Sequence, residues 1–192
     1  MGRTDPDAMG TPPYAQWQSE HKTVRLVAFA EAGGHGDLVI NATNGVASLE
    51  AIEAVGSDRL NGKVVLDLAV PFDFSGGMPP TPTIPNTDSI GERIQRAVPG
   101  ARVVKSLNTV FCNVMVDPAR VPGDHSIFVS GDDADAKTTV TTILGEFGWP
   151  AASIIDLGGI ETSRNTEMYM LLYFGLVGVM DTFDFNIAIA RA

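Results

Sequence analysis

Four short apolar runs in this chain end abruptly in polar or glycine residues, and each is about the length of one β-strand. The clearest covers residues 102–110, in which an apolar segment leads into Ser106, Asn108 and Thr109. The other three runs occupy residues 38–45, 64–71 and 126–133. Ligands of open α/β sheets bind outside the carboxyl ends of the strands, where polar residues replace the apolar run. The repeated pattern therefore predicts an α/β sheet that carries polar groups at one edge.

Helix-like segments alternate with these strand-like runs. The expected strands are residues 24–29, 37–42, 64–69, 102–107, 126–130 and 153–156, with an edge strand at 185–189. The expected helices are residues 14–20, 30–35, 46–55, 89–97, 134–147 and 162–180. Ser89 and Glu92 have the spacing of a capping box. Strands that alternate with helices at short spacing favour a doubly wound, mainly parallel sheet.

The length and composition of the chain fit a single domain. Its 192 residues are 44% hydrophobic and 19% charged, which is enough to bury one continuous core. We divide this domain, residues 1–192, into an irregular lead at 1–22, a βα core at 23–160, and a C-terminal helix with an edge strand at 161–192.

Charge and hydropathy exclude two classes of partner. The formal net charge is -10 and Lys and Arg form no cluster, so we expect no nucleic-acid binding and no attraction to an anionic membrane. The apolar run from Met168 to Met180 is shorter than the roughly twenty residues that a transmembrane helix needs. The single cysteine, Cys112, excludes an internal disulfide, and we expect a reducing, cytoplasmic location.

No phosphate-binding motif is complete. The sequence contains no G-x-G-x-x-G, and the glycine-rich residues 33–36 follow an expected helix instead of preceding one. Residues 56–63 resemble a P-loop, but one extra residue separates the glycines and Val64 replaces the required Ser or Thr. We interpret this segment as the end of a helix and a turn.

Most other polar residues have a simpler structural interpretation. The three histidines lack metal-ligand spacing, so we expect surface histidines and no metal site. Cys112 fits a small apolar packing residue better than a nucleophile. Asp132 and Asp133 fit helix caps better than an acid and base pair. A hydrolase or transferase that uses Asp132 with Asn108 is the weaker rival, because no nucleophile and base stand at motif spacing.

Asn108 and Thr109 are different, because they stand where the strand at 102–107 ends. Amide and hydroxyl groups there can hydrogen-bond a heterocycle or a carboxylate. The same residue types also form turns, and both interpretations stay open at this point.

The chain resembles the NADP oxidoreductases that use the deazaflavin coenzyme known as factor 420, especially the short dinucleotide-binding members. The matching segments are residues 38–43, 72–80, 86–92, 101–110, 115–118, 128–133, 156–160 and 166–169. The resemblance as a whole runs from about residue 3 to residue 191, nearly the whole chain. The resemblance implies a Rossmann-like fold in which NADPH lies across the carboxyl edge of the sheet and passes hydride to a deazaflavin or flavin ring. No catalytic side chain is then expected, because the protein aligns two rings.

The resemblance also implies a role for three groups of residues. The residues that would face the nicotinamide cofactor are Asn41, Ala42, Thr43 and Pro71. Those that would line the site of the second ring are Asn108, Thr109, Val110 and Cys112. Those that would complete that second site, or form a homodimer contact, are Ser163, Arg164 and Glu167.

The chain departs from this family at its start. Family members begin with a strand, a Gly-rich loop, a helix and a second strand, and this sequence shows none of these. We therefore expect an N-terminally truncated sheet with an exposed edge at residues 38–42 and weak NADP binding or none. Val70 also stands where many relatives have Asn. The leading hypothesis is an NADP-dependent oxidoreductase domain impaired by the missing phosphate loop. The alternative is a non-catalytic binding or oligomerisation module that retains only the acceptor half-site, which is the set of residues that would line the site of the second ring.

Overall fold

A five-stranded sheet forms the centre of the computed structural model, which describes residues 12–190. The strands, in their order across the sheet, are β1 (Leu38–Asn41), β2 (Val64–Asp67), β5 (Arg102–Ser106), β6 (Ile127–Ser130) and β7 (Ile154–Asp156). β1, β2 and β5 are parallel, β6 is antiparallel to β5, and β7 is parallel to β6. The predicted mainly parallel α/β sheet is confirmed, with one reversal of direction after β5.

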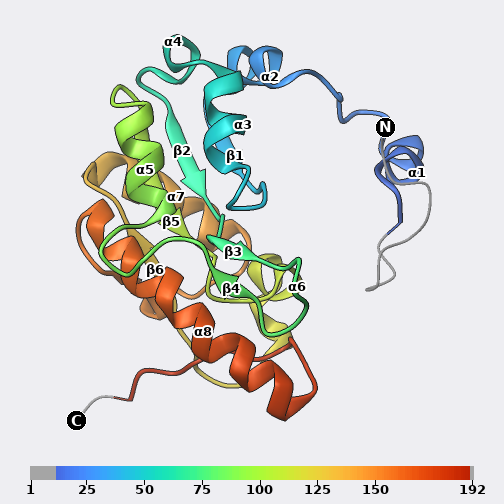
Figure 1. Cartoon of the computed structure of the whole chain (residues 1–192), viewed down its shortest axis with the longest axis vertical. Coiled ribbons are helices and arrows are strands. Elements are labelled where there is room, and N and C mark those ends of the chain that lie inside the picture. The colour runs from blue at the N-terminus through green and yellow to red at the C-terminus, as the bar shows by residue number, and fades with distance from the viewer. Residues whose placement is uncertain (1–11, 191–192) are drawn as a thin grey trace.

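Helices cover both faces of this sheet, and in Figure 1 α5 and α8 lie in front of it while α7 lies behind. The α-helices are α1 (Tyr14–Glu20), α2 (Phe29–His35), α3 (Ser48–Val55), α4 (Ser57–Leu60), α5 (Ile90–Ala97), α6 (Cys112–Val116), α7 (Ala134–Glu146) and α8 (Ser163–Met180). Three short 3₁₀ helices are η1 (Pro118–Arg120), η2 (Ala151–Ser153) and η3 (Ile160–Thr162). The predicted helices are all found, with ends shifted by one or two residues.

The core has two halves because successive strand residues point to opposite faces. Val65 and Val103 pack with Ile94 of α5 on one face. Leu66 and Val104 belong to the other half, which α7 covers. Burial on both faces explains why residues 64–66 and 103–104 are continuous apolar runs instead of alternating ones.

Helix α5 begins at the predicted capping box. The Ser89 hydroxyl accepts a hydrogen bond from the Glu92 backbone N–H at 3.1 Å and donates one to the Glu92 carboxylate at 2.7 Å. Both residues are buried. The cap therefore satisfies groups that water cannot reach.

Removing this cap should destabilise the protein measurably. We expect Ser89→Ala to lower the free energy of unfolding by about 1–2 kcal/mol, because it leaves the buried backbone N–H of Glu92 without an acceptor. Urea unfolding with an unchanged m-value measures this loss. Thr138→Ala on the exposed surface of α7 is the control and should change stability by less than about 0.5 kcal/mol. Equal losses in the two variants would contradict the capping role.

Two predicted strands are wrong. Residues 24–28 form no strand, and Val24 and Leu26 are exposed, because strand-forming residues need a neighbouring strand and none lies beside them among residues 12–190. Residues 185–189 are also irregular. This tail is held by single bonds instead of a ladder: the Ser126 N–H donates to the Ile187 carbonyl at 2.9 Å, and the Asn186 amide donates to the Ser126 carbonyl at 2.8 Å.

Residues 71–85, between β2 and α5, contain a small hairpin. Its strands are β3 (Phe72–Asp73) and β4 (Thr81–Pro82), which pair antiparallel. Phe72 is fully buried and its ring meets that of Phe174 in α8 edge to face, with the ring centroids 5.5 Å apart. The hairpin is therefore fastened to α8 at the edge of the sheet where β2 ends.

The predicted open edge lies at β1. In the part of the chain from residue 12 to residue 190, β1 pairs with β2 on one side and with no strand on the other. Ile40 of this strand is 47% exposed. A hollow of about 300 Å³ beside β1 is lined by α2, β1 and α3 and is mostly apolar.

Candidate functional site

Three loops meet at one edge of the sheet because β1, β2 and β5 run in the same direction. They are residues 42–47, 68–71 and 107–111. The first two loops pack closely against each other. A Cβ atom added to Gly45 would lie 2.0 Å from the Val70 carbonyl oxygen and 2.9 Å from the Pro71 nitrogen. Gly45 is thus required for the close approach of these two loops.

Asn41 anchors the first loop and is only 4% exposed. Its amide nitrogen donates to Asp67 at 2.7 Å and to the Ser48 hydroxyl at 3.1 Å. Its carbonyl oxygen accepts from the Thr43 hydroxyl at 2.6 Å. The Asn41 side chain is therefore used inside the protein to shape the loop, whereas Ala42 is exposed and Thr43 is half-buried.

Pro71 ends the second loop and is buried. Its carbonyl oxygen accepts from the backbone N–H of Thr83 at 2.7 Å and from the Thr83 hydroxyl at 2.9 Å. The hairpin thus fixes the position of Pro71 directly beside Gly45.

The third loop begins at Leu107, which has a left-handed backbone with φ of 64°. A leucine there is costly by about 1–2 kcal/mol, and such strain is often found at functional sites. Asn108 and Thr109 follow and are 2% and 1% exposed. The Asn108 amide nitrogen and the Thr109 hydroxyl are buried without a hydrogen-bond partner among the described residues. Buried polar groups are normally paired, so these two are candidates for pairing with a ligand.

The other two residues predicted for the second ring differ in exposure. Val110 is buried, whereas Cys112 begins α6 and is exposed. The expectation that Cys112 is a buried packing residue is wrong, because the short helix α6 turns its first residue toward solvent.

Ser163, Arg164 and Glu167 stand at the start of α8 and contact α5. The Ser163 hydroxyl is buried without a partner, and a Cβ on Gly91 would lie 2.8 Å from it. Arg164 donates to Glu92 at 2.7 Å, and this bond lowers the pKa of the Glu92 carboxyl. Glu167 is fully buried and accepts from the backbone N–H groups of Ile90 and Gly91.

A buried lysine lies behind the three loops. Lys105 Nζ is 2.6 Å from Asp67, 2.9 Å from Glu167 and 2.6 Å from the Ala69 carbonyl, and all three charged side chains are fully buried. Burial opposes the charge of Lys105, but the two carboxylates outweigh this effect and raise its pKa. Burial raises the pKa of Glu167. Sequence reasoning did not select Lys105 or Asp67, although a lysine inside an apolar strand was a usable signal.

Asp132 and Asp133 lie at the opposite edge of the sheet, because β6 is antiparallel to β5. Asp133 is within 3.9 Å of Arg102, at the start of β5, and caps α7 by accepting from the Ala136 N–H at 2.7 Å. Asp132 accepts from the Ile160 N–H at 2.9 Å. The expectation that all four apolar runs end at one edge is wrong for residues 126–133. An enzyme that uses Asp132 with Asn108 is therefore contradicted.

The glycine-rich segment at residues 33–36 has a packing role. The carbonyls of Gly33 and Gly36 both accept from Lys63 Nζ at 2.6 Å, so carbonyls and not N–H groups converge there. No group of three His, Cys, Asp or Glu side chains that could hold a metal ion occurs within residues 12–190. No helix in the same residues is long and apolar enough to cross a membrane.

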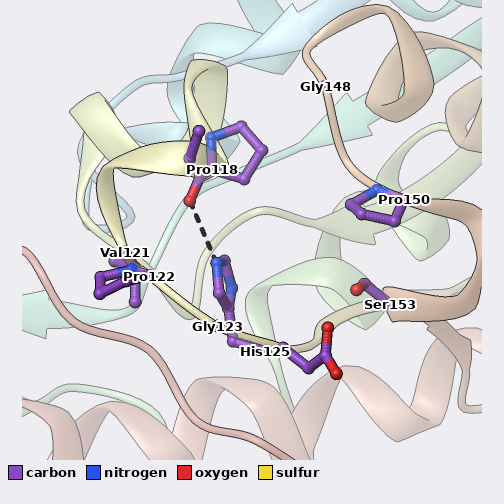
Figure 2. A pocket seen from close by; sticks show the side chains of 10 residues that line it. Pro118, Val121, Pro122, Gly123, His125, Gly148, Pro150 and Ser153 are labelled. Atoms are coloured by element: carbon purple, nitrogen blue, oxygen red, sulfur yellow. Dashed lines mark hydrogen bonds between the residues drawn. The ribbon is translucent and has the colours of Figure 1, made fainter.

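A second hollow, of about 320 Å³, lies among the loops that precede β6 and β7. Figure 2 shows Pro118, Pro122, Pro150 and Ser153 around it, with His125 at its base. His125 Nε2 is 3.1 Å from the Pro118 carbonyl, and the Asn186 amide lies 3.0 Å from Nδ1. Both ring nitrogens are thus occupied, so His125 is a structural residue, and the expectation of a surface position is wrong for it.

Comparisons with known proteins identify the family of the chain and its fold. No family model and no curated protein matches the chain. Among solved structures, a putative factor 420-dependent NADP reductase from Arthrobacter sp. FB24 has 49% identity and a TM-score of 0.89, and the match covers 99% of this chain and 87% of that one. The chain belongs to the family of this reductase, as its sequence motifs suggested.

More distant structures share the fold alone. A hypothetical protein from Sinorhizobium meliloti has 24% identity and a TM-score of 0.61, over 78% of this chain and 70% of that one. A pyrroline-5-carboxylate reductase from Coxiella burnetii has 14% identity and a TM-score of 0.51, over 87% and 56%. The fold is therefore a Rossmann-like α/β fold with a mainly parallel sheet.

Proposed function

We propose that this protein is an NADP-linked oxidoreductase in which hydride passes between NADPH and a deazaflavin or flavin-like acceptor. Membership of the reductase family supports the general NADP-dependent role. The choice of a deazaflavin or flavin acceptor rests on the description of the Arthrobacter relative and on the unpartnered polar groups of Asn108 and Thr109, which would line the site of the acceptor ring. The site is the edge where the loops after β1, β2 and β5 meet.

The observation that carries this proposal is the pair of unpartnered groups at Asn108 and Thr109. Leaving a buried polar group without a partner costs about 1–3 kcal/mol. A heterocyclic ring with carbonyl oxygens would accept from the Asn108 amide, and its ring nitrogens or oxygens would pair with the Thr109 hydroxyl. These residues therefore fit the acceptor ring better than they fit a turn that is complete by itself.

The chain's own residues would align the rings and perform no covalent step. Thr43 and Pro71 form the wall for the nicotinamide ring, with Asn41 holding Thr43 from behind. Val110 and Cys112 would line the rest of the site for the acceptor ring. NADPH, when bound, supplies the hydride. Ordering two reactants at contact distance is a large part of such catalysis, and it requires rigid walls.

The phosphate end of NADP has weaker support. The sequence has no G-x-G-x-x-G, and the glycine-rich residues 33–36 direct carbonyls toward Lys63. We therefore expect weak affinity for NADPH in this chain.

Titration with NADPH, followed by nicotinamide fluorescence, tests the proposal. We expect saturable binding of NADPH that Thr109→Val leaves unchanged. In a second titration with FMN as the acceptor, Thr109→Val should weaken binding about fivefold, because the variant loses a hydrogen bond to the acceptor ring worth about 1 kcal/mol. Thr142→Val is the matched control, since the Thr142 hydroxyl is exposed and bonds within α7. Absence of saturable binding to the unaltered chain would overturn the proposal.

The alternative is a non-catalytic binding or oligomerisation module, and two apolar surfaces favour it. One is the open edge of β1, where Ile40 is exposed. The other is the outer side of α8, where Leu171, Leu172 and Val179 are exposed, so a homodimer belongs to this alternative. A chain that self-associates and does not bind NADPH would support this module over the oxidoreductase.

A further inference from the structure

Lys105 is a fully buried lysine that the proposed hydride transfer does not use. Its ammonium group donates to Asp67, to Glu167 and to the Ala69 carbonyl, which accounts for all three of its N–H bonds. None of these bonds leaves a donor for a ligand. Lys105 therefore acts on the site through its partners and not by contact with a cofactor.

Asp67 carries the effect of Lys105 to both nicotinamide-side loops. One Asp67 oxygen faces Lys105 at 2.6 Å. The other accepts from the Asn41 amide at 2.7 Å and from the Ala69 backbone N–H at 3.1 Å. Asn41 in turn holds the Thr43 hydroxyl at 2.6 Å. A continuous chain of bonds thus runs from Lys105 to the loop at residues 42–47.

Lys105 also holds the second loop directly. Its bond to the Ala69 carbonyl fixes the backbone two residues before Pro71. The two loops touch at Gly45 and Val70, so they can keep this contact only in one relative position. Lys105 and Asp67 together determine that position.

Stability alone does not account for this arrangement. Apolar residues of similar volume often replace a buried ion network without loss of stability. One ammonium with two carboxylates leaves an excess negative charge, and the N–H groups of Ile90 and Gly91 compensate it at Glu167. At Asp67 the matching donors are Asn41 and Ala69, which belong to the site. Glu167 thus connects the network to α5, which is its structural side, whereas Asp67 connects it to the loops of the site.

We propose that Lys105 and Asp67 are a positioning pair, which holds the loops at residues 42–47 and 68–71 in the arrangement that receives the nicotinamide ring. This inference rests on the proposed function for its purpose, and on the hydrogen bonds given above for its mechanism. Glu167, on the structural side, ties α8 to α5 and does not set the loops.

Two isosteric variants test the division. Asp67→Asn leaves Lys105 paired with Glu167, and Glu167→Gln leaves Lys105 paired with Asp67, so each variant keeps a neutral buried pair. Hydrogen exchange of backbone amides, without any cofactor, should become about tenfold faster in residues 42–47 and 68–71 for Asp67→Asn. The same amides should change by less than about twofold for Glu167→Gln. Equal changes in the two variants, or changes spread evenly over β6 and α7, would overturn the proposal.

The unaltered protein provides a test that does not depend on how the variants fold. The Asn41 side-chain amide donates two bonds in a buried place, so its hydrogens should exchange slowly in a nitrogen-15 spectrum. Exchange at the rate of a free asparagine amide would overturn the positioning role.

NADPH binding then separates this inference from the proposed function. If the unaltered chain binds NADPH, Asp67→Asn should raise the dissociation constant about tenfold, while a control on a surface pair, Lys137→Met with Asp156→Asn, should leave it unchanged. An unchanged dissociation constant in Asp67→Asn would overturn the positioning role and leave the proposed function intact. Failure of the unaltered chain to bind would overturn the proposed function, and the exchange rates would still decide whether the pair positions the loops.

Discussion

Gly45→Ala is expected to lower the free energy of unfolding by about 3 kcal/mol, at the upper end of the cost of overpacking. The added Cβ would lie 2.0 Å from the Val70 carbonyl oxygen, which is backbone and cannot rotate away as a side chain would. The two loops must separate to admit it. Urea unfolding measures the loss of stability, and hydrogen exchange at residues 68–72 shows where it arises.

Gly76→Ala is the matched control for this variant. A Cβ at Gly76 meets no atom within 4 Å, and the residue lies in the exposed hairpin loop of the same edge. Its stability should change by less than about 0.5 kcal/mol. If Gly45→Ala were equally neutral, the contact between the two loops would not be the one described.

Lys105→Met is expected to cost about 3–5 kcal/mol, because it leaves Asp67 and Glu167 buried with no cation between them. The folded protein must then protonate a carboxylate or remain strained. Stability of this variant should therefore rise as the pH falls from 7 to about 5, since the folded state binds more protons than the unfolded state in that range. Thermal unfolding across this pH range measures the effect.

The unaltered protein should lose stability at alkaline pH, where Lys105 loses its charge. The pKa of Lys105 is raised in the folded protein above its usual 10.5. The stabilisation that it provides is then fully present below about pH 10.5 and is lost as the pH rises through the folded pKa. Lys137→Met is the control, because its partner Asp156 is 53% exposed to water, and its cost should stay below about 1 kcal/mol. A Lys105→Met variant as stable as this control would show that the buried network contributes nothing.

Much of the fold could be predicted from sequence because burial leaves a local signal. The apolar runs at β2 and β5 mark strands that are covered on both faces, and the Ser89 cap marks the start of α5. Strand direction leaves no such signal, since an apolar run has the same pattern whether it runs up or down the sheet. For that reason β6 was placed in the wrong direction, and Asp132 and Asp133 with it.

The site could be predicted only in part. Asn108 and Thr109 could be selected because they are local, immediately after a strand. The network behind them joins Lys105 to Asp67, 38 residues earlier, and to Glu167 in the last helix, and only the folded chain brings these together. The bonds of Asn41 to Asp67 and Thr43 could not be predicted either, because an asparagine at the end of a strand can contact a ligand or anchor a loop equally well.

In the proposed function, the cofactor binds where the loops after β1, β2 and β5 meet. Nitrogen-15 spectra of the labelled protein, recorded while NADPH is added, locate the binding site residue by residue. We expect NADPH to shift residues 42–46 and 69–72, and subsequent addition of FMN as the acceptor to shift residues 107–112, with the Asn108 side-chain amide among them. Shifts confined to residues 118–125 and 148–153 around the hollow of Figure 2, or no shifts at saturating NADPH, would contradict this placement of the cofactor.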